Sequence, residues 1–141
     1  MSQLSEEFVK SRVIEWLGKH DYVIKSVKTL SEHGVDIKAR KSRSNNFFII
    51  ECKGEPKSNP VKMRYPTLVS GLGEIVQRVK YQRHIRYAIA LPDTYKDLVM
   101  RKIPWVVARK LGLEILLVDI KGKVSRVTWK ELKKRTPRLT S

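Results

Sequence analysis

The sequence predicts an α/β domain built on a mixed β-sheet with helices on both faces. Segments with helical spacing of apolar residues alternate along the chain with short apolar runs rich in β-branched residues. The run Phe47-Phe48-Ile49-Ile50 is apolar at consecutive positions, which is typical of a strand buried on both faces. A sheet of that kind needs helices packed on each side.

The N-terminal part is expected to form a helix followed by strands. Ser5 is suited to cap the helix, and Glu6 and Glu7 lie in its first turn, where the helix dipole favours negative charge. The helix should end near residues 18–20. Strands are predicted to follow over residues 22–29, 35–40 and 47–53, with a polar hairpin loop over residues 41–46.

The rest of the chain is expected to alternate between helices and strands. Residues 54–66 contain Pro56, Pro60 and Pro66 and are predicted to form a loop, with a second helix from Thr67 to about Gln82. Later strands are predicted over 87–91, 113–119 and 124–128, and helices over 93–100 and 104–111. Residues 1–141 fit a single domain, with a basic tail over residues 130–141 that could start as a helix at Trp129 and fray from Lys133 onwards.

The net charge predicts a polyanionic partner. Lysine and arginine total 30 against 14 acidic residues, which gives a formal net charge of +16 and a pI of about 10.2. Self-repulsion of this size destabilises the folded state, and a polyanion relieves it because each phosphate contact releases condensed counterions. Charge alone leaves an enzyme, a binding protein and a ribosome-associated protein open, since the basic residues are spread along the whole chain.

Several classes of protein are not expected. No apolar run is long enough to cross a bilayer, and the first ten residues lack the pattern of a secretory signal. Cys52 is the one cysteine, which excludes an intrachain disulfide, and no histidine has zinc-like spacing to it. These features favour a cytoplasmic protein without a membrane partner.

Chemically active side chains lie at the ends of two adjacent predicted strands. Strand alternation places Glu51 and Lys53 on one face and Cys52 on the other. If the strands pair as a hairpin, Asp36 lies beside Glu51. Two carboxylates at the edge of a core are unfavourable unless they are compensated, and Mg²⁺ compensates such groups well.

A metal-assisted reaction with phosphate would suit this set. Asp36, Glu51 and the Cys52 backbone carbonyl could bind Mg²⁺ or Mn²⁺, which polarises a phosphate and lowers the pKa of a bound water. Lys53 could orient or deprotonate that water, or stabilise the developing charge. The plain alternative is that Asp36 is a turn residue and that Glu51 and Lys53 form a surface ion pair. We favour the functional interpretation because all three residues occur together in a basic α/β domain.

Gly34-Val35-Asp36-Ile37 and the later Ile49-Ile50-Glu51-Cys52-Lys53-Gly54 together resemble the core signature of PD-(D/E)XK nucleases. This superfamily includes restriction endonucleases, archaeal Holliday junction resolvases and RecB-type nuclease domains. Val35 stands where the name-giving proline would be. The later strands resemble those of small Mrr-like and resolvase-like members, so that the likeness spans most of residues 6–124. It implies a restriction endonuclease-like core and a metal-dependent deoxyribonuclease, with endonuclease action favoured.

The same resemblance implies accessory residues. In these families a first-helix glutamate often points into the site, and Glu7 is the best match, with Glu6 the weaker candidate. Both could equally be ordinary first-turn acids. Gln77-Arg78-Val79-Lys80-Tyr81 resembles the QxxxY element of RecB-type nucleases, and Gln77 and Tyr81 share a helix face that Glu74 continues. The alternative for this face is a solvated helix flank.

Basic and polar residues around this set are expected to follow the DNA backbone: Lys57, Lys62, Arg64, Arg78, Lys80, Tyr81 and Arg83. A non-catalytic nucleic-acid-binding domain on the same fold is the main alternative. The intact Asp36, Glu51 and Lys53 set argues against it, because a pure binder has no need of an acidic pocket that repels phosphate. A homodimer would provide two sites for cutting two strands. Junctions, flaps, methylated duplexes and specific sites all stay open as substrates.

Overall fold

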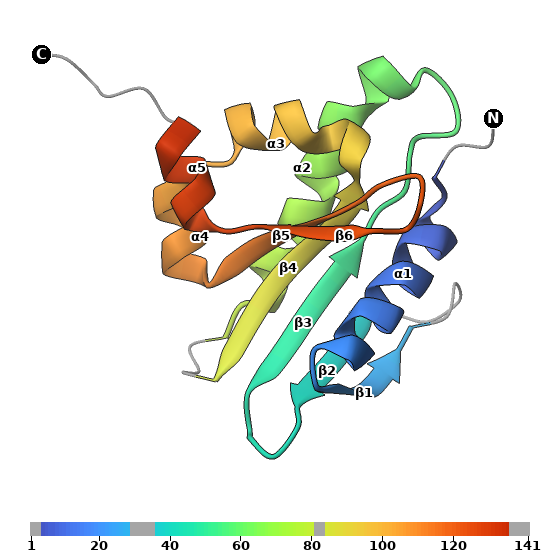
Figure 1. The fold of residues 1–141 in the computed structure, drawn as a ribbon. Helices are drawn as coiled ribbons and strands as arrows, with labels where there is room; N and C mark the ends of the chain where they lie inside the picture. Colours follow the sequence, from blue (N-terminus) through green and yellow to red (C-terminus); the bar gives the residue numbers. More distant parts are fainter. Residues whose placement is uncertain (1–3, 29–35, 81–83, 136–141) are drawn as a thin grey trace, which may run out of the picture.

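The fold is centred on one mixed sheet. The computed structural model describes residues 4–28, 36–80 and 84–135. The sheet has the order β1-β2-β3-β4-β5-β6 (Figure 1). Strands β1 to β3 pair antiparallel, β3 to β5 pair parallel, and β6 returns antiparallel to β5. The strand bounds are β1 Tyr22–Val27, β2 Ile37–Lys41, β3 Phe47–Cys52, β4 Ile85–Pro92, β5 Leu113–Val118 and β6 Val124–Val127. The predicted α/β class with a mixed sheet is confirmed.

Helices cover both faces of the sheet. Helix α1 packs on one face, where Val9, Val13 and Leu17 enter a buried cluster, and the remaining helices contribute to a second cluster on the other face (Figure 1). In the described part of the chain, no helix combines the length and apolar character needed to cross a bilayer. The helix bounds are α1 Glu6–Lys19, α2 Pro60–Arg78, the 3-10 turn η1 Asp93–Tyr95, α3 Lys96–Lys102, α4 Trp105–Leu111 and α5 Trp129–Arg135.

Strand β3 is buried from both sides, as its apolar run predicts. Phe48, Ile50 and Cys52 belong to the cluster under α1, whereas Ile49 packs against the cluster under α2. Each apolar side chain so buried contributes roughly 1.5–3 kcal/mol. The central position of β3 therefore fixes which face its C-terminal residues present.

The predicted loop over residues 54–66 is wrong in its second half, because α2 begins at Pro60. A proline suits the first turn of a helix, where its missing N–H has no intrahelical partner to lose. Pro66 lies inside α2 and removes one hydrogen bond. Burial of Leu68 and Ile75 against the sheet offsets that loss. Helix α2 ends at Arg78, where Val79 is extended, so its predicted continuation over residues 79–80 is wrong, and residues 81–82 lie outside the described residues.

The tail predicted over residues 130–141 is helical over its first part, and the fraying expected from Lys133 is wrong, because the helix continues to Arg135. Residues 130–135 belong to α5, where Leu132 is buried, and Trp129 contacts Trp105 with ring centroids 5.9 Å apart. These contacts stabilise the helix through a charged run that has little apolar periodicity of its own. Residues 136–141 lie outside the described residues.

Gly54 sets the close approach of α1 to the end of β3. A Cβ atom at Gly54 would lie 2.7 Å from the backbone carbonyl carbon of Ser5 and closer still to the backbone nitrogen of Glu6. Glu55 N–H donates to the Leu4 carbonyl at 2.8 Å beside this contact. The start of α1 is thereby held against the residues that follow β3.

We expect Gly54→Ala to lower the free energy of unfolding by about 1–3 kcal/mol, because the backbone of α1 must move away. Urea unfolding measures this loss. Gly73→Ala is the matched control, since Gly73 lies inside α2 with nothing within 4 Å of its Cβ position. That variant should gain about 0.5–1 kcal/mol. Equal effects in the two variants would show that the close approach at Gly54 does not matter.

Candidate active site

Acidic and basic side chains meet at the C-terminal end of β3. Ile37 of β2 lies opposite Ile50 of β3 in the antiparallel register, so Asp36 and Glu51 come next to each other just beyond that pair. Lys53 follows directly after β3, and its N–H donates to the Ala90 carbonyl of β4 at 3.0 Å. The predicted hairpin pairing of these strands is confirmed.

Asp36 is a buried residue, with 3% of its surface exposed. Its Oδ2 accepts a hydrogen bond from the Cys52 N–H at 2.7 Å. Its Oδ1 lies 3.5 Å from Lys28 Nζ and 3.8 Å from Lys10 Nζ. The carboxylate therefore ties β3 to the start of β2, and the two ammonium groups balance its charge.

The Cys52 backbone faces Asp36, whereas its side chain is buried on the α1 side. In a strand, the N–H and C=O of one residue point to the same neighbouring strand. Because the Cys52 N–H reaches Asp36, the Cys52 carbonyl also points towards the Asp36 side. The oxygen atom that the sequence suggested as a third ligand thus lies on the correct edge of β3.

Glu51 has no exposed surface, and it is incompletely paired. Its Oε1 accepts from Arg78 Nε at 3.1 Å, whereas Oε2 has no hydrogen-bond partner within the described residues. Burial, the nearby Glu74 carboxyl and the charge of Asp36 raise the pKa of Glu51 to about 8. The Arg78 side chain that contacts Glu51 is partly exposed.

Helix α2 approaches the sheet closely and supplies a third carboxyl group. Lys53 Nζ donates to Glu74 Oε1 at 3.1 Å. A Cβ atom at Gly71 would lie 2.5 Å from Ile89 Cδ1, so the glycine lets this turn of α2 approach the Ile89 side chain closely, and the Lys53 stem lies beside it with Cγ 3.4 Å from that Cβ position. Lys53 is therefore paired with Glu74 rather than with Glu51, and the simple surface pair considered from the sequence is not formed.

On helix α1, Glu6 rather than Glu7 is affected by the charge of Asp36. Burial and the charge of Asp36 raise the pKa of Glu6, whereas Lys53 and Lys10 lower it. Glu7 is exposed. Both glutamates line a hollow of about 560 Å³ together with Lys53 and Lys57. The role assigned to Glu7 stays a prediction, and Glu6, the weaker candidate from sequence, is the residue that Asp36 influences.

The predicted DNA-contacting residues lie in different surroundings. Lys57 and Lys62 are exposed, and Lys57 lines the hollow that contains Lys53, whereas Arg64 is paired with Glu55 at 2.7 Å. Gln77 is exposed and lines a separate groove with Arg78 and Lys80. The predicted residues Tyr81 and Arg83 lie outside the described residues.

The cations that pair with the acids are not evident from the sequence. Lys10 and Lys28 contact Asp36, and Arg78, which is expected from the sequence to contact DNA, contacts Glu51. One signal was available, because Lys10 lies four residues after Glu6 and shares its helix face. The position of Lys28 beside Asp36 depends on the pairing of β1 with β2.

The donor set suits a hard divalent cation held by few protein ligands. Asp36 and Glu51 offer carboxylate oxygens, and the unpartnered Glu51 Oε2 is a buried acceptor that gains from a cation. Within the described ranges, no group of three or more histidine, cysteine, aspartate or glutamate side chains is arranged to hold a metal. A bound Mg²⁺ would therefore keep several water ligands, as it does in many phosphate-processing sites.

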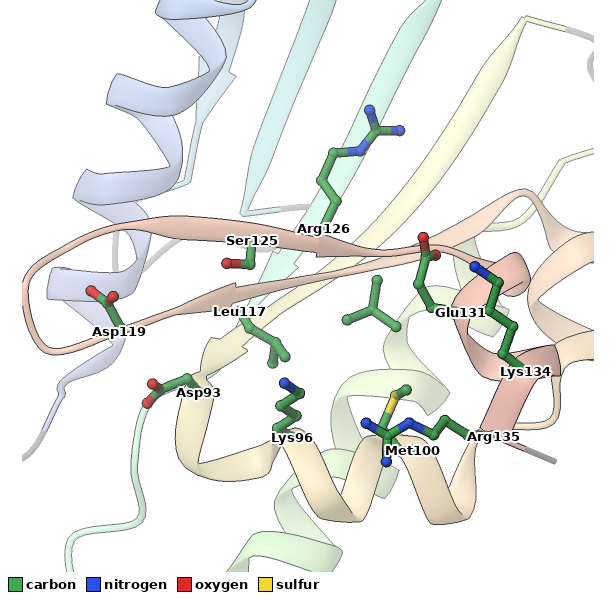
Figure 2. Close-up of a pocket in the computed structure, with 11 residues that line it drawn as sticks. Asp93, Lys96, Met100, Leu117, Asp119, Ser125, Arg126, Glu131, Lys134 and Arg135 are labelled. Atoms are coloured by element: carbon green, nitrogen blue, oxygen red, sulfur yellow. The ribbon is translucent and has the colours of Figure 1, made fainter. Parts of the chain in front are cut away.

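A second hollow, of about 380 Å³, lies between β5, β6, α3 and α5 (Figure 2). Figure 2 shows Asp93 and Lys96 at one side and Glu131 and Lys134 at the other. Acidic and basic groups alternate around its wall, so this hollow has no marked preference for an anion or a cation. It adds no catalytic candidate.

Two solved structures share the fold. No protein-family model and no curated protein match the chain. An XisH family protein from Nostoc punctiforme is 18% identical over 84% of this chain and 96% of that one, with a TM-score of 0.57. An fdxN element excision controlling factor protein from Anabaena variabilis is 19% identical over the same shares, with a TM-score of 0.52. At these identities the likeness concerns the α/β fold alone.

The raised pKa of Glu51 predicts a pH dependence of stability in a chelating buffer. The folded state holds the proton of Glu51 up to about pH 8, whereas an ordinary glutamate releases it near 4.5. Stability from this residue is therefore fully present below about pH 4.5 and is lost as pH rises through 8. Glu51→Gln should flatten that decline in urea unfolding measured from pH 5 to 9.

Glu15→Gln is the control for this measurement, because Glu15 is exposed on α1 and pairs with Arg12 and Lys19. Its pH profile should follow that of the wild type. An unchanged decline in Glu51→Gln would show that other groups cause it.

Proposed function

We propose that this protein is a metal-dependent nuclease of the PD-(D/E)XK superfamily that hydrolyses phosphodiester bonds in DNA, acting as an endonuclease. One observation carries the proposal. A fully buried Glu51 with an unpartnered oxygen lies beside Asp36, with Lys53 on the same side of β3, in a chain of net charge +16. A buried acidic group destabilises the folded state unless a ligand compensates its charge.

The proposed metal ligands are Asp36, Glu51 and the Cys52 carbonyl, with Mg²⁺ or Mn²⁺ as the ion. When bound, the ion would polarise the scissile phosphate and lower the pKa of a water ligand. Asp36 is held in place by the Cys52 N–H at 2.7 Å, so one ligand is oriented by the backbone of another. A ligand held by a hydrogen bond of this kind is already positioned before the metal binds.

Lys53 is the proposed partner of the attacking water. Its Nζ is held by Glu74 Oε1 at 3.1 Å, on the face of β3 that carries Glu51. From there it would orient the water or stabilise charge on the phosphate. As a base, Lys53 would first release its own proton to Glu74 and then take the proton of the water. Glu7 and Gln77 are retained as accessory candidates, and Glu6 joins them because its charge is coupled to that of Asp36.

DNA is the proposed substrate class because of the basic surface. Lys57 lines the hollow that contains Lys53, and both Lys57 and Lys62 are exposed and suited to contact phosphates. One structural neighbour is an fdxN element excision controlling factor protein, which is in keeping with a role connected with DNA. A homodimer would present two such sites to the two strands of a duplex.

We expect wild-type protein to cut at least one of four substrates with Mg²⁺ or Mn²⁺ and none with EDTA: linear duplex, single strand, supercoiled plasmid and four-way junction. Asp36→Asn and Glu51→Gln should lower the rate by a factor on the order of 10²–10³ while DNA binding persists, since each removes a charged ligand. Gel assays of cleavage and of binding measure both effects.

Glu15→Gln serves again as the control and should cut like the wild type, because Glu15 lies on the exposed face of α1. Binding without cutting in any metal, by wild type and variants alike, would favour the non-catalytic nucleic-acid-binding domain instead.

A different outcome is expected at Lys53. Lys53→Met keeps the stem that packs beside Gly71 but removes the ammonium group. Cleavage should fall by a factor on the order of 10²–10⁴. The affinity for Mn²⁺, followed by calorimetry, should fall little, because Lys53 is not a ligand. A large loss of Mn²⁺ affinity would show that Lys53 acts through the metal site.

A further inference from the structure

A groove of about 520 Å³ lies beside α2 on the face of the sheet opposite α1. Lys38 of β2 is exposed on this face and lies opposite Ile49 in the β2–β3 register. Ile49 and Tyr87 contribute to the floor of the groove, and Lys80 contributes to its rim. The volume is within the range of about 300–1,000 Å³ that is usual for small-ligand sites.

The lining of the groove is basic. Lys38, Arg78 and Lys80 contribute positive charge, and no carboxylate among the described residues lines it. This differs from the mixed lining of the hollow in Figure 2. The Lys80 N–H donates to Tyr87 Oη at 3.0 Å, which fixes the backbone at one end of the groove. The charge complements a phosphate backbone.

Phe47 gives the groove an aromatic surface. This side chain is half-buried and belongs to neither hydrophobic cluster of the fold, so core packing does not explain it. Lys38 Nζ lies 5.1 Å from the centroid of its ring, in a cation–π contact. Aromatic rings beside basic side chains are the usual platform for unpaired bases, because every base has a face that stacks.

Arg78 connects the groove to the buried acid. The guanidinium that lines the groove also donates from Nε to Glu51 Oε1 at 3.1 Å. A strand lying in the groove would therefore have a phosphate close to Arg78, next to the Asp36–Glu51 pair. Arg78 is thus the residue shared between the groove and the acidic pair.

We propose that this groove binds an unpaired DNA strand, with one base stacked on Phe47 and phosphates on Lys38 and Lys80. Stacking displaces the Lys38 ammonium from the ring and leaves it free for phosphate. The inference rests on the proposed nuclease function and narrows its substrates to DNA with unpaired nucleotides beside the cut, such as single strands, flaps and branched ends. A base inside a regular duplex cannot present its face to Phe47.

The test is fluorescence anisotropy in EDTA, where binding is measured without cleavage. The probes are a labelled single strand of about 16 nucleotides, at the upper end of site sizes for such grooves, and the matched duplex. Wild type should bind the single strand more tightly. Phe47→Ala should weaken that binding about 5- to 150-fold, the effect of removing one stacking platform, and leave duplex binding nearly unchanged.

Two further substitutions separate stacking from mere bulk. Phe47→Leu should lose binding as Phe47→Ala does, whereas Phe47→Trp should bind at least as tightly as the wild type. These two variants keep the test valid if Phe47→Ala proves unstable. Unchanged single-strand binding in Phe47→Ala or Phe47→Leu would overturn the inference. So would tighter binding of the duplex, or of an RNA strand of the same sequence.

Charge is tested by the double variant Lys38→Gln with Lys80→Gln. The slope of log affinity against log salt should fall by about 0.7 for each phosphate that a lysine no longer neutralises. The matched control is Lys19→Gln with Lys121→Gln, which removes two exposed charges from the end of α1 and the β5–β6 turn. An equal fall of the slope in both double variants would overturn the assignment of the phosphates to this groove.

Failure of this inference can be told from failure of the proposed function. Metal-dependent cutting of DNA that does not depend on Phe47 would support the nuclease function and contradict the proposed role of the groove. Single-strand binding that depends on Phe47, without cutting in any metal, would leave the groove as the binding site of a non-catalytic protein.

Discussion

The hydrogen bond from the Cys52 N–H to Asp36 Oδ2 is the contact on which the site depends. At 2.7 Å and buried, it replaces a strand-to-strand backbone bond by a bond to a side chain at the end of β3. That exchange places a carboxylate beside Glu51 without leaving the Cys52 donor unpaired. Strand alternation then directs Glu51 towards α2 and the Cys52 side chain towards α1.

Helix α2 supplies the other charged side chains of the site. Its close approach at Gly71 brings Glu74 to Lys53, and Arg78 follows Glu74 by one helical turn to reach Glu51. Each acid of the site is thus held against a cation, with Glu51 Oε2 as the unpartnered buried exception within the described residues. In a chain of net charge +16, this local acidity is the feature that separates the site from the surrounding surface.

Much of the fold and the central pair could be predicted from local patterns. The hairpin spacing between Asp36 and Glu51 and the alternation that joins Glu51 to Lys53 are properties of neighbouring residues, and the register bears them out. The errors arose where packing overrides local preference. Pro60 starts a helix within a proline-rich segment, and Leu132 anchors a helix within a charged one, because burial against the sheet stabilises both.

The sequence by itself determined the α/β class, the double-sided burial of β3 and the juxtaposition of Asp36 and Glu51, because a strand repeats every two residues whatever surrounds it. Only the tertiary structure decided that Arg78, and not Gln77, contacts Glu51, and that Glu6 is coupled to Asp36. Those choices depend on how each helix is rotated about its axis. That rotation is set by the side chains it buries against the sheet, which lie far apart in the sequence.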